Sequence, residues 1–456
     1  MPPSADTRTP DTPPAGAPPH RSKTWVEWLL SPIAEVHRDE AGRALLMTAV
    51  MFLILAAYYE LKTAREAFIL TEGGAEVKSY SSAGQAVLLL FLVPAYGAFA
   101  SRVDRGRLIR WVTLFFIANI ALFVLAVQAG LKIGIVYFLW VGIFNVMVIA
   151  QFWAFANDIF TPEQGKRIFP LIGVGSSLGA WVGSVRAGWI MQTGGATELL
   201  VRGALLLGVC IVLAHLLNRM TNRAAVQDQK AAVREEPLGK EGGFELIRKD
   251  RYLMLIAALV VLLNVVNTSG EYLFGRYVVE QANALHADAA ARERFVGETY
   301  SRLFSTVNLL GFLLQMFVVS RVFKFLGVGR SLFVHPIVAL TGYLLLLRAP
   351  SVQLMALLKV ADNSIDYSLG NTTKQALWLP TSREAKYKAK QAVDSFFVRA
   401  GDVIQAGVVF VGERLAFAVP AFAAVNVVLV GLWLLVVGLL NVELRHKAQA
   451  SHSKAL

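Results

Sequence analysis

Long blocks of apolar residues without any charge constrain the fold of this sequence more than any other feature. The blocks from Leu45 to Ala57 and from Leu255 to Val266 contain no charged side chain. A bilayer core of about 30 Å needs about 20 apolar residues in one helix, because each residue adds 1.5 Å. Helices satisfy their own backbone hydrogen bonds where water is excluded. The pattern predicts an all-α polytopic membrane protein.

The overall composition agrees with a membrane protein and excludes several other classes. Hydrophobic residues make up 55% of the chain and charged residues 17%, whereas soluble domains hold about 25% charged residues. The net charge of +12 indicates basic cytoplasmic loops rather than a nucleic-acid partner. The single cysteine, Cys210, lies in an apolar block, so the sequence predicts no disulfide framework and no metal or other cofactor.

The chain divides into two membrane halves with polar segments around them. We expect a proline-rich disordered tail (1–23), an interfacial amphipathic helix that the capping pair Thr24 and Glu27 begins (24–40), and a cytoplasmic linker (219–250). The two six-helix halves are expected over 41–218 and 251–443, followed by a tail over 444–456. The twelve predicted spans are 44–62, 80–100, 111–129, 133–156, 168–190, 199–218, 251–273, 300–320, 331–348, 352–376, 390–412 and 417–441.

Basic residues gather in the even-numbered loops. The loop after span two has four arginines against one acid, the loop after span eight has three basic residues, and the loop after span ten has four against Glu384. The loop after span seven is balanced between acids and bases. Because short cytoplasmic loops hold the excess of Lys and Arg, both termini are predicted to be cytoplasmic.

Two short sequence matches predict that the halves are repeats of each other. Residues 101–103 and 320–322 share the sequence Ser-Arg-Val, and residues 161–166 and 381–386 share Thr, one acid and Lys in similar places. Both matches fall at corresponding loops with almost one offset. They indicate six-plus-six pseudo-repeats of the type found in major facilitator transporters.

Glycines and a basic loop suggest how the helices pack and move. Residues 173, 175, 179 and 183 are glycines inside an apolar helix, which favours close helix packing over phosphate binding. The loop sequence Gly97-x6-Asp104-Arg105-Gly106-Arg107 resembles the cytoplasmic loop signature of the major facilitator superfamily. Asp104 and Arg105 are therefore candidate gating residues, and a purely topological role for this basic loop stays open.

Charged and amide side chains inside the spans are the candidate binding residues. Each charge costs about 2.5–3.5 kcal/mol at the bilayer centre, so such residues are expected to form ion pairs or face a water-filled cavity. In span one, Lys62 is expected to neutralise Glu66, which leaves Arg65 as a free cation, and Arg186 in span five stands alone. The candidates for substrate binding are Lys62, Arg65, Arg186, Asn267, Glu271, Lys359, Asn363, Lys374 and Arg399.

A second set of side chains is predicted to take part in proton coupling or gating. About half of the charges within spans are expected to form ion pairs between helices. His335 precedes Pro336 and is expected to be structural more than a proton relay. The coupling and gating candidates are Asp104, Arg105, Asp158, Asp362, Asp366 and Asp402.

Two sequence blocks sit in equivalent places in the two halves. In the first block, residues 152–158 read Phe-Trp-Ala-Phe-Ala-Asn-Asp, and residues 166–175 contain Lys-Arg-x-Phe-Pro-Leu-x-Gly-x-Gly. This block resembles the nucleotide exchange family, the ATP/ADP translocases of plastids and intracellular bacteria, and the second block, residues 367–380 continuing to Asp394, resembles the tenth-span signature of the same family. The resemblance implies a twelve-span carrier of the bacterial inner membrane, with a small-molecule solute and the lipid bilayer as its partners and a monomeric state.

The substrate residues of that family transfer unevenly to this chain. Its basic residue in span one corresponds to Arg65, and its span-four glutamate falls near Val141. Its span-seven glutamate falls at Asn267, and family lysines fall at Asp366 and Asp402. An aspartate in place of a lysine repels a polyanion, so the resemblance leaves the identity of the solute open.

Three functions remain open from the sequence. The first is exchange of a nucleotide or related phosphorylated anion by alternating access between the two halves. The second is proton-coupled transport of a cationic or zwitterionic solute, with Glu271, Asp362, Asp366 and Asp402 as titrating groups. The third is a membrane sensor or scaffold without transport. An enzyme is not expected, because no nucleophile elbow, metal-ligand cluster or Walker A sequence is present.

Overall fold

The protein is helical throughout its described residues, which in this computed structural model are 36–100, 105–220, 242–349 and 351–455. No strand occurs among them, so the predicted all-α class is confirmed. The helices are α2 (Arg38–Ala100), α3 (Arg105–Gln128), α4 (Gly134–Ile159), α5 (Pro162–Arg219), α7 (Gly243–Lys249), α8 (Arg251–Leu285), α9 (Ala289–Phe317), α10 (Val319–Ser331), α11 (Val334–Arg348), α12 (Val352–Ile365), α13 (Asn371–Ala376), α14 (Lys390–Ala392), α15 (Val398–Arg414) and α16 (Val419–Ala455). Three π-helical turns, η1 (Asp366–Gly370), η2 (Ala385–Ala389) and η3 (Val393–Phe397), continue the helices around them.

The two longest helices, α2 and α5, each bend at one glycine. Gly74 has φ 77° and ψ −176°, and Gly195 has φ 72° and ψ −170°. Side chains with a Cβ rarely adopt such positive φ values, so glycine permits the chain to reverse with a single non-helical residue. Each of these helices therefore consists of two arms. The expected loop between spans one and two, residues 63–79, is helical except at this bend.

Seven described helices are long and apolar enough to cross a membrane, or up to eight when α9 and α10, which bend by 74°, are counted as one span. Large apolar side chains are also exposed on their outer surfaces, among them Phe91, Trp111, Leu205 and Leu435. A soluble protein does not expose apolar surface of this extent. The chain is therefore a multi-pass membrane protein.

The glycines predicted to permit close packing do so between α2 and α5. A Cβ added to Gly179 would lie 2.2 Å from the carbonyl oxygen of Phe52, and one added to Gly183 would lie 2.5 Å from that of Ala56. Such distances leave no room for any side chain. The packing interpretation is confirmed for these glycines, whereas a Cβ on Gly173 would meet nothing within 4 Å.

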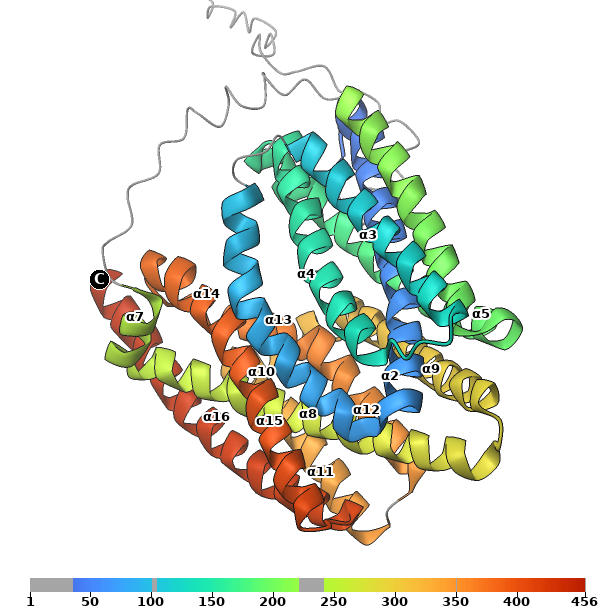
Figure 1. Cartoon of the computed structure of the whole chain (residues 1–456). Coiled ribbons are helices and arrows are strands. Elements are labelled where there is room, and N and C mark those ends of the chain that lie inside the picture. The colour runs from blue at the N-terminus through green and yellow to red at the C-terminus, as the bar shows by residue number, and fades with distance from the viewer. Residues whose placement is uncertain (1–35, 101–104, 221–241, 350, 456) are drawn as a thin grey trace, which may run out of the picture.

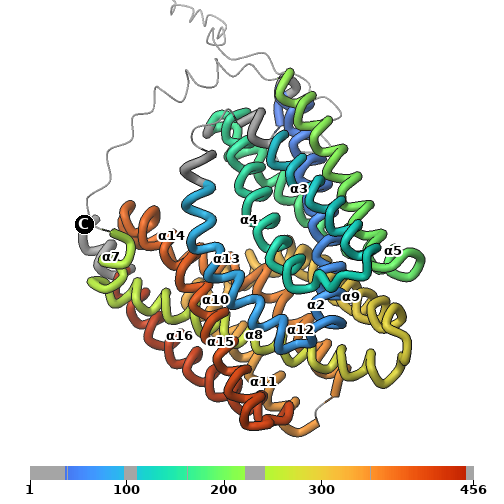
Figure 2. Tube along the Cα trace, viewed as in Figure 1, coloured from blue at the N-terminus to red at the C-terminus, as the bar shows by residue number. Residues whose placement is uncertain are grey.

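The described chain forms an N-terminal half (36–220) and a C-terminal half (242–455), which lie side by side in Figures 1 and 2. One apolar core consists only of N-terminal residues. The other core belongs mainly to the C-terminal half and is joined by N-terminal residues near the bend of α2, including Ile69, Leu70 and Ala75. The halves therefore meet closely around that bend.

Hydrogen bonds between the halves run from this end toward the middle of the helices. Ser301 donates to the carbonyl oxygen of Ser184 at 2.7 Å, and the backbone N–H of Ala196 donates to the Glu293 carboxylate at 3.2 Å. At the same end, Glu72 of α2 accepts a 2.7 Å hydrogen bond from the first N–H of α4. We call this end, where α2 and α5 reverse, the Gly74 end.

Several segments differ from the sequence expectation or lie beyond the described chain. Helix α16 continues to Ala455 through the region expected to be a tail, and the short helix α7 lies inside the expected linker. The expected disordered segment 1–23 and all but the end of the expected interfacial helix lie outside the described residues. Asp104 is also outside them, and the side chain of Arg105 is not described.

Candidate functional site

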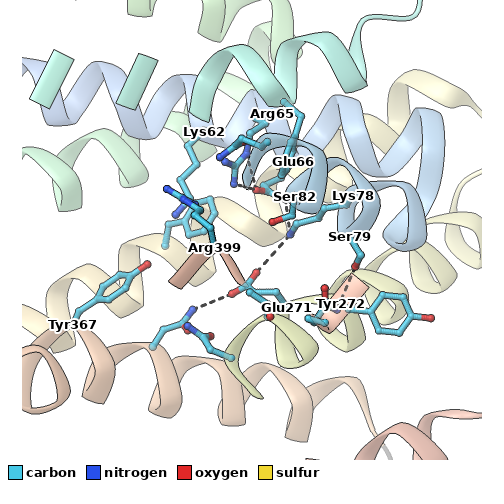
Figure 3. A pocket seen from close by; sticks show the side chains of 17 residues that line it. Lys62, Arg65, Glu66, Lys78, Ser79, Ser82, Glu271, Tyr272, Tyr367 and Arg399 are labelled. Carbon is cyan, nitrogen blue, oxygen red and sulfur yellow. Dashed lines mark hydrogen bonds and ion pairs between the residues drawn. The ribbon is translucent and has the colours of Figure 1, made fainter. Parts of the chain in front are cut away.

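A cavity of about 330 Å³ lies between the two halves. Its walls come from both arms of α2 and from α4, α8, α9, α12, η1 and α15, so it exists only where the halves meet (Figure 3). The lining residues are Lys62, Arg65, Glu66, Lys78, Ser79, Ser82, Gln85, Phe138, Asn267, Thr268, Glu271, Tyr272, Phe304, Asn363, Tyr367, Arg399 and Gln405.

Cations outnumber carboxylates on the cavity wall. Lys62, Arg65, Lys78 and Arg399 line it, against the two acids Glu66 and Glu271. In a site from which most water is excluded, such an excess of positive charge attracts anions strongly. The cavity is therefore electrostatically suited to an anionic solute.

The predicted neutralisation of Glu66 by Lys62 is wrong. Glu66 is paired instead with its neighbour Arg65 and, at 2.7 Å, with Lys78. Lys62 lies over the ring of Phe304, 4.2 Å from its centroid, and Arg65 lies over Phe138 at 4.6 Å. The expectation failed because Lys78 reaches Glu66 from the other arm of α2, which the sequence does not reveal.

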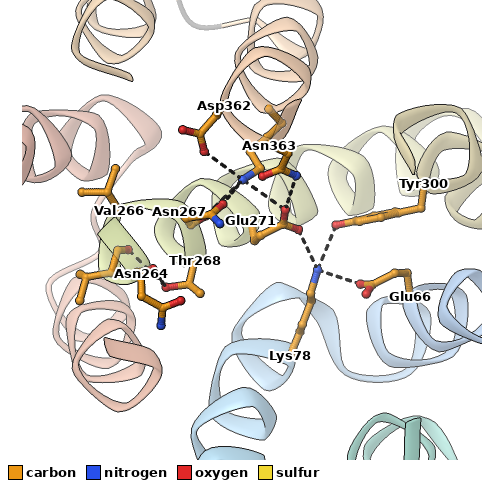
Figure 4. A network of polar contacts seen from close by, with 12 residues as sticks. Glu66, Lys78, Asn264, Val266, Asn267, Thr268, Glu271, Tyr300, Asp362 and Asn363 are labelled. Atoms are coloured by element: carbon orange, nitrogen blue, oxygen red, sulfur yellow. Dashed lines mark hydrogen bonds and ion pairs between the residues drawn. The ribbon is translucent and has the colours of Figure 1, made fainter. Parts of the chain in front are cut away.

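An unbroken chain of ion pairs runs from the cavity wall into the C-terminal half (Figure 4). Lys78 also contacts Glu271 of α8 at 3.5 Å, and Glu271 in turn contacts Lys359 of α12 at 3.2 Å. Lys359 lies 3.5 Å from Asp362, whose other oxygen is 2.7 Å from His335 of α11. Each buried charge in this series of ion pairs therefore has a partner of opposite sign, which reduces the free-energy cost of keeping it in the membrane.

Amide and aromatic side chains complete the cavity wall. Asn363 donates to Glu271 at 3.2 Å, and the side-chain oxygen of Asn267 accepts a 2.7 Å hydrogen bond from Lys359. Phe138, Phe304 and Tyr367 add ring surfaces on three different elements. The π-helical turn η1 widens the helix where Tyr367 projects, a deviation common at functional sites.

Six of the nine predicted substrate-binding residues line the cavity, and a seventh, Lys359, lies directly behind Glu271. The other two, Arg186 and Lys374, lie outside it. Arg186 is paired with the buried Glu60 at 3.4 Å, and Lys374 is paired with Asp366 at 3.0 Å. The expectation that Arg186 stands alone is therefore wrong, because Glu60 of α2 faces it across the α2–α5 contact. The six are Lys62, Arg65, Asn267, Glu271, Asn363 and Arg399.

The predicted coupling residues Asp158, Asp362, Asp366 and Asp402 do not line the cavity. Asp402 accepts hydrogen bonds from Asn264 at 2.8 Å and Arg399 at 3.4 Å. Asp362 is buried between His335 and Lys359. Asp402 and Asp362 therefore contact the side chains of Arg399 and Lys359 rather than the cavity itself.

Sequence reasoning missed Lys78 and Gln85 as cavity residues, and it did not place Glu66 or Gln405, two polar residues inside spans, among the binding candidates. The sequence pattern places Lys78 in a loop because the next apolar run begins after it, whereas its side chain is buried at 8% exposure. Gln85 and Gln405 are single polar residues in apolar helices, and this was the available signal. Serines 79 and 82, Thr268 and the aromatic rings gave no such signal.

Comparison with known proteins identifies relatives of this chain. The family model of the TLC ATP/ADP transporter matches residues 133–349. ADP,ATP carrier protein 1 of Rickettsia bellii (strain RML369-C) is 23% identical over an alignment that covers 93% of this chain and 97% of the relative. ADP,ATP carrier protein 1 of Chlamydia pneumoniae is 22% identical and covers 65% of this chain and 64% of the relative.

Solved transporter structures share the fold. A bacterial homologue of the iron transporter ferroportin superposes with a TM-score of 0.61 at 14% identity and covers 88% of this chain and 98% of its own. The nucleoside transporter NupG has the same TM-score at 11% identity and covers 87% and 98%. The fold is that of the major facilitator type, and the comparisons confirm the predicted resemblance of this chain to the nucleotide exchange family of ATP/ADP carriers.

Proposed function

We propose that this protein is a secondary transporter that exchanges an ATP- or ADP-like nucleotide across the bacterial inner membrane by alternating access. One observation carries the proposal: the cavity between the halves has four cations against two carboxylates. The ADP,ATP carriers related to this chain suggest which anion it takes. Exchange needs no ATP hydrolysis, which agrees with the lack of a Walker A sequence.

In this proposal the chain crosses the membrane twelve times as two six-helix repeats. The two arms of α2 and of α5 give four spans, and α3 and α4 complete the first half. The second half uses α8, α9, α11, α12 with α13, α15 and α16. The basic loops lie in the cytoplasm with both termini, so the Gly74 end faces outward and the halves are closed there.

The solute binds with its phosphates at the cations and its base at the rings. Lys62, Arg65 and Lys78 lie near one another on the two arms of α2 (Figure 3). Their charge-assisted hydrogen bonds supply affinity for phosphate oxygens. Aromatic faces such as those of Phe138 and Phe304 suit a planar base, and the amides of Asn267 and Asn363 suit its polar edge.

The two aspartates that replace family lysines do not oppose this function. Asp366 is paired with Lys374 and Asp402 with Arg399, so each acid has its own cation. Without Arg399, the cavity wall still has Lys62, Arg65 and Lys78 against two carboxylates. Of the four acids considered for proton coupling, only Glu271 lines the cavity. The geometry therefore favours an anion exchanger over a proton-coupled carrier of cations.

Reconstitution into lipid vesicles tests the proposal. Vesicles loaded with ADP should take up labelled ATP with saturation, and vesicles loaded with adenosine should not, because adenosine has no phosphate for the cations to bind. Absence of uptake by protein that melts cooperatively rejects nucleotide exchange. Uptake that requires a pH gradient and no internal nucleotide would instead support the proton-coupled alternative.

A further inference from the structure

We propose that the contact between Lys78 and Glu271 is a latch that holds the halves closed at the Gly74 end, and that an anionic solute releases it. This inference rests on the proposed function. Lys78 lies on the second arm of α2 and Glu271 lies on α8, so the contact joins the two halves. Both side chains also line the cavity, so the latch lies within reach of whatever the cavity holds.

Lys78 is held at the meeting point of three groups. Its ammonium lies 2.7 Å from Glu66, 3.5 Å from Glu271 and 3.3 Å from the hydroxyl of Tyr300 (Figure 4). Glu66 is in its own half, whereas Glu271 and Tyr300 are in the other. The shorter ion pair, Lys78 with Glu66, is therefore within the N-terminal half, and the ion pair across the halves, Lys78 with Glu271, is longer.

Neither partner is left without a counter-charge when the latch opens. Lys78 keeps Glu66, and Glu271 keeps Lys359 at 3.2 Å and the amide of Asn363 at 3.2 Å. A buried charge that loses its sole partner costs several kcal/mol, and this arrangement avoids that cost. The latch is thus built to open and close rather than to stay permanently formed.

A phosphorylated solute weakens the contact between Lys78 and Glu271. Its negative charge attracts Lys78 and repels Glu271, so it weakens the attraction between the halves. An empty cavity restores the pair. Neutral hydrogen bonds across the halves, such as that from Gln405 to Ser79, carry no net charge, so the solute's charge does not shift them in this way. A carrier whose halves open at the Gly74 end only when solute is bound exchanges one solute molecule for another and does not let solute pass in one direction alone.

Cross-linking in the absence of nucleotide tests the latch by itself. Gln192 and Glu298 hydrogen-bond across the halves at the Gly74 end, and the one cysteine, Cys210, is buried. In a Cys210→Ala background, Gln192→Cys and Glu298→Cys should cross-link readily with a short bis-maleimide. Adding Glu271→Gln should slow this reaction about fivefold or more, a typical coupling effect.

The matched control is Glu280→Gln on the same helix. Glu280 also pairs with an arginine, Arg276, but within one half, so its loss should leave the cross-linking rate unchanged. Lys78→Gln is the second latch variant and keeps Glu66 paired with Arg65 and Glu271 paired with Lys359. It should slow cross-linking like Glu271→Gln, and melting curves verify that both variants are folded.

The solute response and the transport assay complete the test. ATP added to the otherwise unaltered cysteine pair should slow cross-linking, and Glu271→Gln should admit labelled ATP into vesicles without internal nucleotide. Unchanged cross-linking in folded Glu271→Gln and Lys78→Gln overturns the latch, even where exchange is normal. If ATP leaves the cross-linking rate unchanged in a protein that exchanges ATP, the solute does not release the latch. A slowed reaction in the variants without any nucleotide exchange supports the latch and rejects the proposed solute instead.

Discussion

Arg65 is held against the cavity by two different contacts. It pairs with Glu66, and its guanidinium lies over the ring of Phe138. A planar, permanently charged group fixed in this way is pre-organised to bind phosphate oxygens in pairs. Removing it does not unbalance the site, because Glu66 keeps Lys78.

We therefore expect Arg65→Gln to raise the KM for ATP exchange by about 10- to 100-fold, the effect of losing hydrogen bonds to a charged group. Initial exchange rates in reconstituted vesicles over a range of ATP concentrations measure this. Arg251→Gln is the control, because its side chain is 66% exposed at the start of α8 and lies outside the cavity. Equal KM values for the two variants would show that Arg65 does not take part in binding the solute.

Charge within apolar segments was enough to find many cavity residues, but not their partners. Lys62, Arg65, Asn267 and Glu271 stand out because such side chains are rare inside spans. Which cation meets which acid depends on side chains that approach from other helices, as Lys359 approaches Glu271. Lys78 was missed for a related reason: a charge that faces a cavity looks like the end of a span.

At the scale of whole helices, the α2–α5 contact explains why glycine recurs along one face of α5. The added Cβ of Gly179 would overlap the carbonyl of Phe52 at 2.2 Å, so the two backbones touch. Replacing this glycine pushes the helices apart and strains the N-terminal half. Gly173, by contrast, faces open space.

Gly179→Ala should therefore destabilise the protein by about 1–3 kcal/mol, as overpacking does. Thermal unfolding in detergent, followed by circular dichroism, measures the shift in melting temperature. The same substitution at Gly173 is the comparison and should be neutral or stabilising by about 0.5–1 kcal/mol, because alanine favours helix. A Gly179→Ala protein as stable as the Gly173→Ala protein would contradict the close contact.

The helical class and the glycine contact were predictable from local sequence. The start of α5 was not predicted: the fifth span was expected from residue 168, whereas Thr161 caps the helix through a reciprocal pair with Gln164. The reversal of α2 at a single residue was not predictable, because Gly74 follows another glycine and several charged residues that suggest a loop. Two of those charges have partners inside the helix bundle: Glu72 accepts from the N–H groups of Ile133 and Gly134, and Lys78 pairs with Glu66 and Glu271.

For the molecule as a whole, the number of spans and their direction make one joint prediction. Ala287 lies in the exposed connection between α8 and α9, and Lys324 lies exposed on α10 beyond the far end of α9. With twelve spans and basic loops inside, these two positions lie on opposite sides of the membrane.

Single cysteines at these positions in the Cys210→Ala protein test that arrangement. In intact spheroplasts, a membrane-impermeant maleimide should label Ala287→Cys at once and Lys324→Cys only after permeabilisation. The reverse order would place the termini outside. Equal labelling of both positions in intact cells would show that α9 and α10 do not separate the two faces.

The tight bends at Gly74 and Gly195 also limit how much polypeptide protrudes at the Gly74 end. The bends at Gly74 and Gly195 are one residue each, and the neighbouring connections within the described residues include 129–133, 286–288 and 415–418. Proteases and binding proteins engage protruding, flexible polypeptide. Connections this short leave little protruding polypeptide at this end for a protease or a binding protein to engage.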